Sequence, residues 1–557
     1  RVLDARAEQR SALITLTAGQ SYAFEAFNFN YDSDSALSIG WLPPGASAPT
    51  LVPAEFVAPP ASLPPGLTLP AAPRGATLRL RCFAPGMMPS KIATRSYVSG
   101  MAPAQSALPS VFLSGDPEKV FFGPNGIYGH DGGSLIEDPD DSDDRIWVPN
   151  NKRTDYSMAL AFGRAFERPA VFEALLPDGS LAGRTGAGIR FSGSAYSRPH
   201  YRLDNLDAPY PWTMDWRGKP QMNLFFRGPL GDKTFKSKAL LPASTIDDWN
   251  SLRLRAGRSG DNITLLYDEL VRRLFAAQGQ PVVTGRPVNA FLNGQLRGLF
   301  LLLERPREDW LKTYYDTDTS FTLKVHDTVE SGDPNNVDDM FDLVKATDCS
   351  TPAGYAILRD LWDLENVADY AILNSYIASG DFVYKRSDQN FVMFRDDRPG
   401  GKWRFSVWDA ESSFGSEEHT VNTNWTQDVL LNEPFTIPNE KSVIRAVFRR
   451  AYQNPEFRVL FADRVQRAFG PGGPYSSAGL NAVLAEVNAP LAAAQTAWLG
   501  TEPNTAPAQA WFAAREAIQL SQWSALGLWS SVGAPVASPP GGVLAPGQTV
   551  SISNPNG

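Results

Sequence analysis

The chain has 557 residues, of which 43 % are hydrophobic and 45 are prolines, so it is too long for one core and we predict a large domain with smaller modules. Its net charge of -9 and the absence of any Lys/Arg-rich run argue against a nucleic-acid backbone or an anionic membrane as main partner. A nucleotide bridged by a metal ion remains compatible with this charge. No run of about 18 apolar residues occurs, so no transmembrane segment is predicted.

Cysteine and histidine usage excludes several kinds of site. Cys82 and Cys349 are the only cysteines, too few for a disulfide framework or a thiolate metal site. The four histidines are scattered, and none has the His-x-x-x-His spacing of a zinc site. We therefore expect neither a histidine-based metal site nor a histidine-containing catalytic triad.

The first 60 residues predict a β module. Strand-like alternation occurs in Ala12–Leu16, Tyr22–Phe27 and Ala36–Trp41. The segment Leu16-Thr-Ala-Gly-Gln-Ser-Tyr22, followed by a strand that ends at Trp41, resembles the closing half of a PA14 domain, a β-sandwich of secreted proteins. Because the chain enters this module late, we expect it to be a fragment of a longer protein.

A second small module is predicted over residues 61–100. After the Pro-rich linker Pro59–Pro73, the strands Thr77–Ala84 and Pro89–Tyr97 resemble the end of a chitobiase-type, fibronectin-like repeat, which would place them in a small sandwich. Residues 531–557 are rich in proline and glycine and look like the start of a further β module.

The main domain is predicted to span residues 106–530, and its first part is rich in loops. Aspartates crowd the stretch from Asp138 to Asp144. A charge run of this kind is usually a solvated loop. Ca²⁺ binding is the alternative, but the glycine at the sharp turn of an EF-hand loop is missing.

A hairpin and two helical regions follow. Val288–Leu292 and Gln295–Glu304 flank Asn293-Gly294, a strong hairpin signal. Apolar spacing predicts a helix over Tyr355–Ser379, which Gly380 would end. Helical periodicity returns between residues 442 and 511.

Carboxylates and an amide gather where two short strands begin and end. The strands and their turn are predicted at residues 391–395, 403–408 and 396–401, respectively. With this turn Asn390 lies opposite Asp409, and Glu411 follows two residues later. An amide oxygen beside a carboxylate suits a hard cation such as Mg²⁺, and Asp381 would stand close by without being a ligand.

Four blocks of the main domain resemble, in order and spacing, the CotH kinase family, first known from spore-coat assembly and related to the protein-kinase fold. The blocks are residues 126–128 with 168–173, 219–231 with 252–255, 292–305, and 381–415. The resemblance covers roughly residues 106–530. It implies an α+β fold, with an atypical protein-kinase-like main domain and small N-terminal β-sandwich modules.

Phosphoryl transfer needs placed charges more than covalent chemistry. The resemblance implies ATP and Mg²⁺ as cofactors, with Lys219 on the α- and β-phosphates and Glu304 holding Lys219 in an ion pair. Asp381 would orient or deprotonate the acceptor hydroxyl. The metal ligands would be Asn390 and Asp409, with Glu411 as a weaker candidate for a second contact.

Other interpretations of these residues stay open. The lysines that compete with Lys219 are Lys233, Lys236 and Lys238. Glu304 could instead pair with a surface arginine, Arg305 or Arg307. Asp381 precedes Asn390 by nine residues rather than the usual four or five, so Asp388 is an alternative base. Gln389 stands where many family members have histidine.

The leading hypothesis is an extracytoplasmic, ATP- and Mg²⁺-dependent CotH-type protein kinase that phosphorylates Ser or Thr of secreted or surface proteins. The first rival is a non-enzymatic pseudokinase scaffold or adhesion protein of the cell surface, whose β modules bind glycans or proteins. A hydrolase that uses Asp409 and Glu411 as an acid/base pair is the second rival, but nothing places a substrate between these carboxylates.

Overall fold

The computed structural model gives an α+β protein with two compact units. It describes residues 40–41, 50–51, 74–80, 82, 88, 90–123, 125–138, 141–148, 150, 156–158, 163–192, 201–202, 213–214, 221–256, 263–326, 328–380, 383–384, 387–388, 390–415, 419–432, 440–499, 502–530, 532, 535–539 and 543–554. Lys219, Asp381 and Gln389 lie outside these residues, as does nearly all of the predicted 1–60 module. Asp388 is described by its backbone alone.

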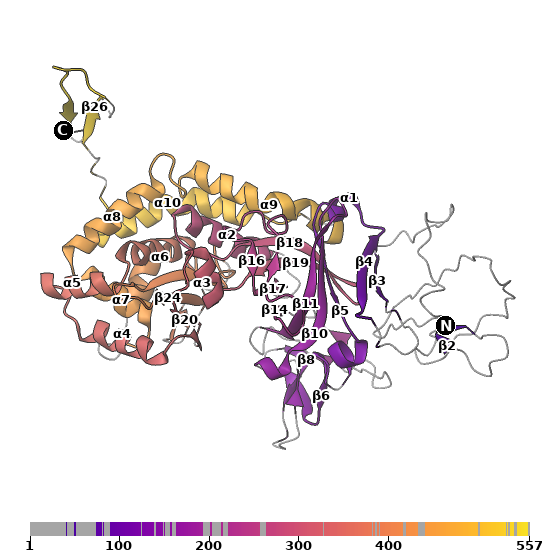
Figure 1. Ribbon diagram of the computed structural model, residues 1–557. Helices are drawn as coiled ribbons and strands as arrows, with labels where there is room; N and C mark the ends of the chain where they lie inside the picture. The colour runs from indigo at the N-terminus through magenta and orange to yellow at the C-terminus, as the bar shows by residue number, and fades with distance from the viewer. Residues whose placement is uncertain are drawn as a thin grey trace. The chain divides into compact units, whose positions relative to one another are not determined.

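The barrel unit comprises Arg1–Leu265, Thr284–Arg305 and Ala489–Pro503. Its centre is a closed barrel (Figure 1) in the order β10-β11-β14-β17-β19-β18-β5. The strands are β5 (Ser110–Ser114), β10 (Arg168–Leu175), β11 (Leu181–Phe191), β14 (Met222–Phe226), β17 (Ser251–Arg255), β18 (Gly285–Leu292) and β19 (Gln295–Glu304). All pairs are antiparallel except β18 with β5.

Cross-strand partners form rows on the two faces of this sheet, because directly opposite residues share a face. One row runs Ile189–Leu224–Leu252–Glu304, and its three apolar members are fully buried. Glu304 therefore ends an otherwise apolar row. The other face carries the row Arg190–Asn223–Arg253–Leu303.

The Asn-Gly hairpin is confirmed, and β19 ends at Glu304 as predicted. Asn293 and Gly294 have φ values of 47° and 79°, the left-handed pair that a tight hairpin turn requires. The Asn293 side chain also accepts a hydrogen bond from the Gly115 N–H at 2.8 Å.

The strands predicted near residues 77–97 form a two-stranded hairpin, β3 (Arg74–Leu80) with β4 (Ala93–Ser99). A separate sandwich is not supported, because this hairpin binds to the barrel. The Ser96 N–H donates to Glu173 at 3.1 Å, and the Gly75 N–H donates to the Gly294 carbonyl at 3.1 Å.

The acidic stretch is strand rather than loop. β7 (Ser134–Asp138) pairs antiparallel with β8 (Asp141–Val148). The aspartate side chains lie outside the described part of the chain, so Ca²⁺ binding stays a prediction.

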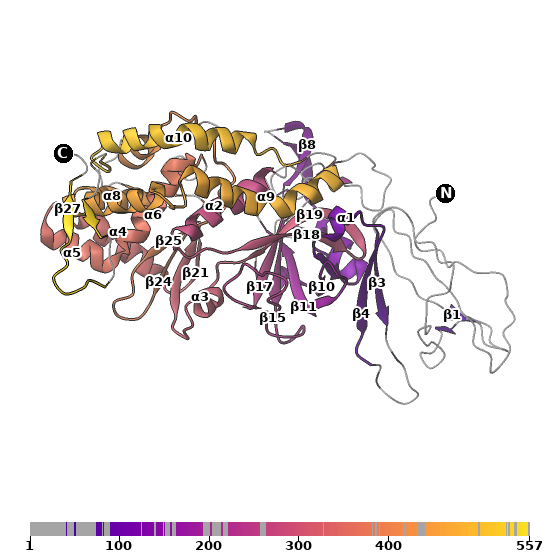
Figure 2. The same ribbon diagram turned by 90° about the horizontal axis from the view of Figure 1, so that it is seen from above.

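The sheet unit comprises Leu266–Val283, Pro306–Asn488 and Asn504–Gly557. Its four-stranded sheet has the order β21-β20-β24-β25, formed by β20 (Phe321–Val325), β21 (Thr328–Ser331), β24 (Phe391–Asp396) and β25 (Arg404–Val407). The helices are α3 (Glu308–Tyr314), α4 (Pro334–Ala346), α5 (Pro352–Leu361), α6 (Leu364–Ile377), α7 (Val443–Tyr452), α8 (Pro455–Phe469) and α10 (Ala506–Ala525), with parts of α2 (Ile263–Ala277) and α9 (Ser477–Leu499). Helix α6 packs on β25, and α8 and α10 pack on α6 (Figure 2).

The single helix predicted over residues 355–379 is wrong, because the chain breaks into α5 and α6 at Trp362. Here the backbone leaves the helical pattern to pair with Trp403: the Asp363 N–H donates to the Trp403 carbonyl, and the Trp403 N–H to the Leu361 carbonyl, both at 3.0 Å. Asp363 then caps α6 by accepting from the Asn366 N–H.

The end of α6 also differs from the prediction. Ala378, with φ of 47°, is the left-handed residue that ends the helix, rather than Gly380. The Gly380 N–H instead donates to the Ser412 carbonyl at 2.8 Å.

Both strands at the predicted cation site are confirmed to within a residue at each end. Their predicted register is wrong by one position, because Phe391 pairs with Val407 rather than with Trp408. The turn accounts for the shift: Arg398 N–H donates to Asp396, Gly401 N–H donates to the Arg398 carbonyl, and Gly400 has φ of 83°.

The helical segment predicted from 442 to 511 is confirmed as α7, α8, α9 and the start of α10. Among the described residues, no helix combines the length and apolar character needed to cross a membrane.

Candidate functional site

Three neighbouring strands of the sheet unit have an end on the same side of the sheet. We call this row of strand ends the edge; it is distinct from the outermost strand of the sheet. Val325 pairs with Val392, and Phe391 with Val407. His326 directly follows β20, Asn390 directly precedes β24, and Asp409 lies two residues after β25, so each strand carries one polar residue at this edge.

All three polar residues have left-handed backbones, with φ of 53° at His326, 48° at Asn390 and 54° at Asp409. Asn, Asp and His tolerate this region better than other side chains, yet each still carries a conformational cost of order 1–3 kcal/mol. Strained residues gathered at one edge are a reason to look for function there. We name His326, Asn390 and Asp409 the edge triplet.

His326 holds Asn390 in place. The His326 N–H donates to the Phe391 carbonyl at 2.9 Å, and its ring Nδ1 accepts from the Asn390 N–H at 3.2 Å. The ring therefore bonds the backbone of the predicted metal ligand. Sequence reasoning missed this residue, because it considered histidines only by zinc-ligand spacing and His326 lies 64 residues from Asn390.

A buried ion pair on α2 fixes the chain next to Asp409. Asp268, fully buried, accepts from the Ala410 N–H at 3.0 Å and also pairs with Arg272. Arg272 bonds Glu269 as well, at 2.7 Å. Burial lowers the pKa of Arg272, but the charges of Asp268 and Glu269 outweigh it, so the pKa lies above its usual value.

The loop that follows Asp409 is tied to the end of α6. The Phe414 N–H donates to the Ile377 carbonyl at 2.9 Å, and the Ser413 hydroxyl donates to the Ala410 carbonyl at 2.8 Å. With the bond from Gly380 to Ser412, these contacts place the loop beside the residue that immediately precedes Asp381. Asp409 and Glu411 are both half-buried.

Helix α10 supports the same structure. Arg515 is fully buried and donates to the carbonyls of Ser375 and Tyr376 at 2.7 and 3.3 Å, which belong to the last turn of α6. The Trp511 indole also donates to the Tyr376 carbonyl at 2.9 Å, and its ring packs edge-on against Phe414. Burial lowers the pKa of Arg515 to about 10.

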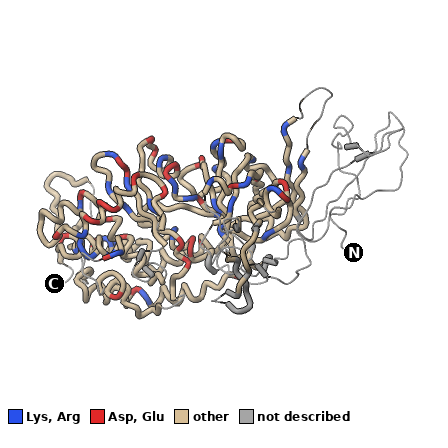
Figure 3. The backbone as a smooth tube through the Cα atoms, turned by 90° about the horizontal axis from the view of Figure 1, so that it is seen from below, with Lys and Arg blue, Asp and Glu red and all other residues tan. Residues whose placement is uncertain are grey.

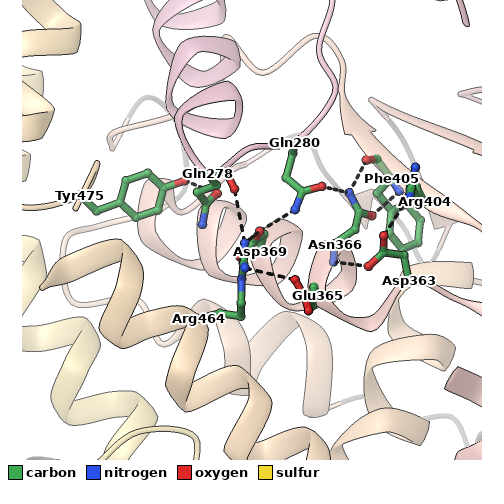
Figure 4. Close-up of polar contacts among 10 residues, drawn as sticks. All are labelled: Gln278, Gln280, Asp363, Glu365, Asn366, Asp369, Arg404, Phe405, Arg464 and Tyr475. Carbon is green, nitrogen blue, oxygen red and sulfur yellow. Dashed lines mark hydrogen bonds and ion pairs between the residues drawn. The ribbon is translucent and has the colours of Figure 1, made fainter. Parts of the chain in front are cut away.

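A polar network lies behind β25 (Figure 4). Asn366 bonds both backbone groups of Phe405: its Oδ1 accepts from the Phe405 N–H at 2.6 Å and its Nδ2 donates to the carbonyl at 3.0 Å. Because β25 is the outermost strand of its sheet, the amide takes the place of a missing strand. Asp363 holds Arg404 at 2.9 Å.

Buried charges anchor this network to α8. Arg464 donates to Asp369 at 2.7 Å, Gln280 donates to Asp369 at 2.6 Å, and the Asn366 amide donates to Gln280 at 2.8 Å. Burial raises the pKa of Asp369, although the hydrogen bond from Arg464 acts in the opposite direction. The chain from α8 to β25 thereby fixes the strand that leads to Asp409.

Glu304, in the barrel unit, is buried among neutral donors. One oxygen accepts from the Ser244 hydroxyl and, at 2.8 Å, from the Trp249 indole; the other accepts from the N–H and hydroxyl of Thr284 at 2.8 and 3.1 Å. Burial raises the pKa of the Glu304 carboxyl, and these four hydrogen bonds offset part of that rise.

This burial contradicts a surface pair between Glu304 and Arg305 or Arg307. Glu304 is 1 % exposed, and Arg307 pairs with Glu330 instead. An ion pair with Lys219 stays a prediction, since Lys219 lies outside the described residues. Of the competing lysines, Lys236 pairs with Asp248 at 3.1 Å.

Two competing lysines remain. Lys233 is exposed. Lys238 donates to the carbonyl of Ser244, whose hydroxyl bonds Glu304. Lys238 therefore lies nearest to Glu304 by hydrogen-bond connection among these rivals.

With the observed register Asn390 is not directly opposite Asp409 as predicted, but the two lie at the same end of adjacent strands. Their amide and carboxylate oxygens are of the kind that a hard cation prefers. The described residues contain no group of three or more His, Cys, Asp or Glu side chains placed to hold a metal. Asp381 is outside the described residues, and Asp388 lies in the two-residue strand β23 (Ser387–Asp388), which pairs with β22 (Val383–Tyr384).

The comparison with family models agrees with this location. Residues 251–470 match the model described as CotH kinase protein. The match includes Glu304, the edge triplet and Asp268, whereas Lys219 and α10 fall outside it. It gives no support to PA14-like or chitobiase-like modules at the N-terminus. No curated protein matches the chain significantly.

Proposed function

We propose that this protein is a CotH-type kinase that transfers phosphate from ATP, with Mg²⁺, to Ser or Thr hydroxyls of secreted or surface proteins. The observation that carries the proposal is the edge triplet: Asn390 directly precedes β24 and Asp409 lies two residues after the adjacent β25, both within the CotH-matched segment. The extracytoplasmic location is inferred only from the PA14-like sequence pattern between Leu16 and Trp41.

Asn390 and Asp409 would hold Mg²⁺, with Glu411 as a further contact, and the ion would neutralise charge on the phosphates. His326 and Asp268 orient the backbone at these ligands. Asp381 would orient or deprotonate the acceptor hydroxyl.

A pseudokinase scaffold is the second candidate, and Glu304 favours it. The phosphate-binding lysine of a kinase needs a carboxylate partner. Glu304 already accepts four hydrogen bonds from neutral donors, so Lys219 would have to share a carboxylate that is occupied. A protein that binds nucleotide without transferring phosphate would fit this arrangement.

Thermal unfolding with ADP or ATP, with and without Mg²⁺, tests the proposal, because a ligand at about 100 times its Kd stabilises by about 2.7 kcal/mol. We expect a Mg²⁺-dependent rise in Tm for the parent and none for Asp409→Ala. Asp360→Ala, at an exposed position of α5, is the matched control. No shift in the parent would exclude the kinase and nucleotide-binding pseudokinase alike.

Transfer of labelled phosphate from ATP to Ser/Thr peptides separates the two candidates. A kinase should lose transfer in Asp381→Ala and keep it in Asp388→Ala. The reverse pattern would assign the base to Asp388, and binding without transfer would identify a pseudokinase.

A further inference from the structure

Three guanidinium groups surround one phenylalanine ring in the barrel unit. The guanidinium carbons of Arg190, Arg227 and Arg305 lie 5.2, 5.1 and 4.9 Å from the centroid of Phe225. Phe225 is 7 % exposed. Cations over an aromatic face are attracted by its quadrupole, but three of them at one ring also repel each other.

The carboxylate at this cluster is already engaged. Arg227 binds Glu167 through two hydrogen bonds, at 2.9 and 2.7 Å. Burial lowers the pKa of Arg190; Glu167 raises it, and the nearby charge of Arg227 lowers it further. Among the described residues, the half-buried Arg190 and Arg227 thus share the carboxylate of Glu167.

Arg190 also has an unused donor. Its Nε is buried and, within the described part of the chain, has no hydrogen-bond acceptor. A buried N–H without an acceptor is destabilising, because it has lost its hydrogen bonds to water without gaining a replacement. An anion that reached the guanidinium group would supply the missing acceptor and would also be attracted by the charges of Arg190 and Arg227.

The same sheet face extends the positive surface. Asn223 is the cross-strand partner of both Arg190 and Arg253, and Arg253 donates to the Asn223 side chain at 3.0 Å. Along the described backbone, basic and acidic positions are interleaved (Figure 3).

We propose that this face, defined by Arg190, Arg227, Arg305 and Phe225, binds a phosphate group. Arginine's planar fork matches phosphate oxygens, and a doubly charged anion neutralises more of the cluster than a monovalent one. The group would come from free phosphate, a phosphorylated side chain or the polyphosphate of a nucleotide. The site does not depend on the proposed kinase function.

Titration of the full chain with inorganic phosphate tests the site, against NaCl at equal ionic strength. Calorimetry should detect phosphate binding to the parent, with a rise in Tm. We expect about tenfold weaker binding in Arg190→Gln, because the guanidinium fork is removed. Arg79→Gln, on exposed β3, is the matched control and should bind as the parent does.

Arg190→Lys controls for a folding defect, since it keeps the positive charge and loses only the planar guanidinium group. We expect weaker phosphate binding and an unchanged far-UV circular dichroism spectrum. Equal effects of phosphate and chloride, or parent-like binding by both Arg190 variants, would overturn the proposal.

Three further probes identify the source: phosphoserine, tripolyphosphate and ADP without Mg²⁺. A probe that binds more tightly than phosphate, and that loses this binding in Arg190→Gln, identifies the source of the phosphate group. If none of the three does so, the ligand is free phosphate. Asp409→Ala should retain phosphate binding, which keeps this test separate from that of the kinase.

Discussion

The two units differ in the partners of their buried charged side chains. In the sheet unit, Arg272 is matched by Asp268 and Glu269, and Arg464 by Asp369. In the barrel unit, Glu304 is buried among neutral donors, and Arg190 has a buried donor without an acceptor in the described chain. Matched charges are typical of a scaffold that holds a site rigid, whereas unmatched ones leave room for a ligand.

This difference gives the units distinct roles. The charge networks of the sheet unit end on the backbone of β25 and of Ala410, so they stabilise the strained edge triplet. Preorganisation of this kind is what a metal site requires of its surroundings. Arg515 is an exception within the sheet unit, because it is fully buried and donates to backbone carbonyls. The predictions below begin with the matched charge of Asp268, continue with Arg515 and His326, and end with Glu304 in the barrel unit.

Loss of Asp268 should have the largest effect. Asp268→Ala leaves Arg272 with one carboxylate in a fully buried position, and breaking such a pair costs about 3–5 kcal/mol. We expect a strongly lowered free energy of unfolding in urea, together with loss of the Mg²⁺-dependent nucleotide shift. Asp360→Ala should change neither quantity. A stability loss below 1 kcal/mol would show that the matched charges do not support the edge.

Loss of Arg515 should have the second-largest effect, since its guanidinium group donates hydrogen bonds to the last carbonyls of α6. Arg515→Ala leaves the buried Ser375 carbonyl without this donor, whereas the Tyr376 carbonyl keeps the Trp511 indole, and we expect a loss of about 3 kcal/mol. Because α10 lies beyond the CotH-matched segment, the result tests whether that segment functions alone. Arg359→Ala on the exposed side of α5 is the control. Unchanged nucleotide binding in a folded Arg515→Ala protein would separate α10 from the site.

His326 should affect ligand binding more than stability. His326→Gly removes the acceptor for the Asn390 N–H but relieves the left-handed strain, so the two effects on stability nearly cancel, each about 1 kcal/mol. Mg²⁺ should bind about 10–100-fold more weakly, as for lost partners of metal ligands. The affinity follows from nucleotide-induced Tm shifts over a Mg²⁺ series. If the Tm shifts of His326→Gly depend on Mg²⁺ as those of the parent do, His326 serves only to form the turn.

Local signals explain which elements sequence could predict. The Asn293-Gly294 turn needs two left-handed residues, and the flanking strands follow from it. The break at Trp362 left one local signal, the helix-capping Asp363. The apolar spacing continues across the break, and the pairing with Trp403 that causes it is tertiary.

The candidate site divides in the same way. Asn390 and Asp409 flank predictable strands, so their shared edge could be inferred. His326 and Asp268 reach that edge only through strand pairing and helix packing. One-residue errors of register arise because turn geometry, here at Gly400, sets the ladder.

The smallest effect, and the most informative about the barrel unit, concerns Glu304. Its pKa is raised by burial, so the folded chain binds more protons than the unfolded chain between the two pKa values. The stability that Glu304 contributes is then complete below the unfolded pKa and falls as the pH rises through the folded one. Glu304→Gln lacks this fall and should gain stability relative to the parent from about pH 4 upward. Urea unfolding of both proteins across this pH range measures the difference.

A lysine that neutralises Glu304, as the kinase pattern requires of Lys219, would lower the pKa of Glu304 and reverse the sign of this pH trend. The direction of one pH trend therefore decides whether the barrel unit carries the kinase ion pair or the neutral arrangement that favours a scaffold.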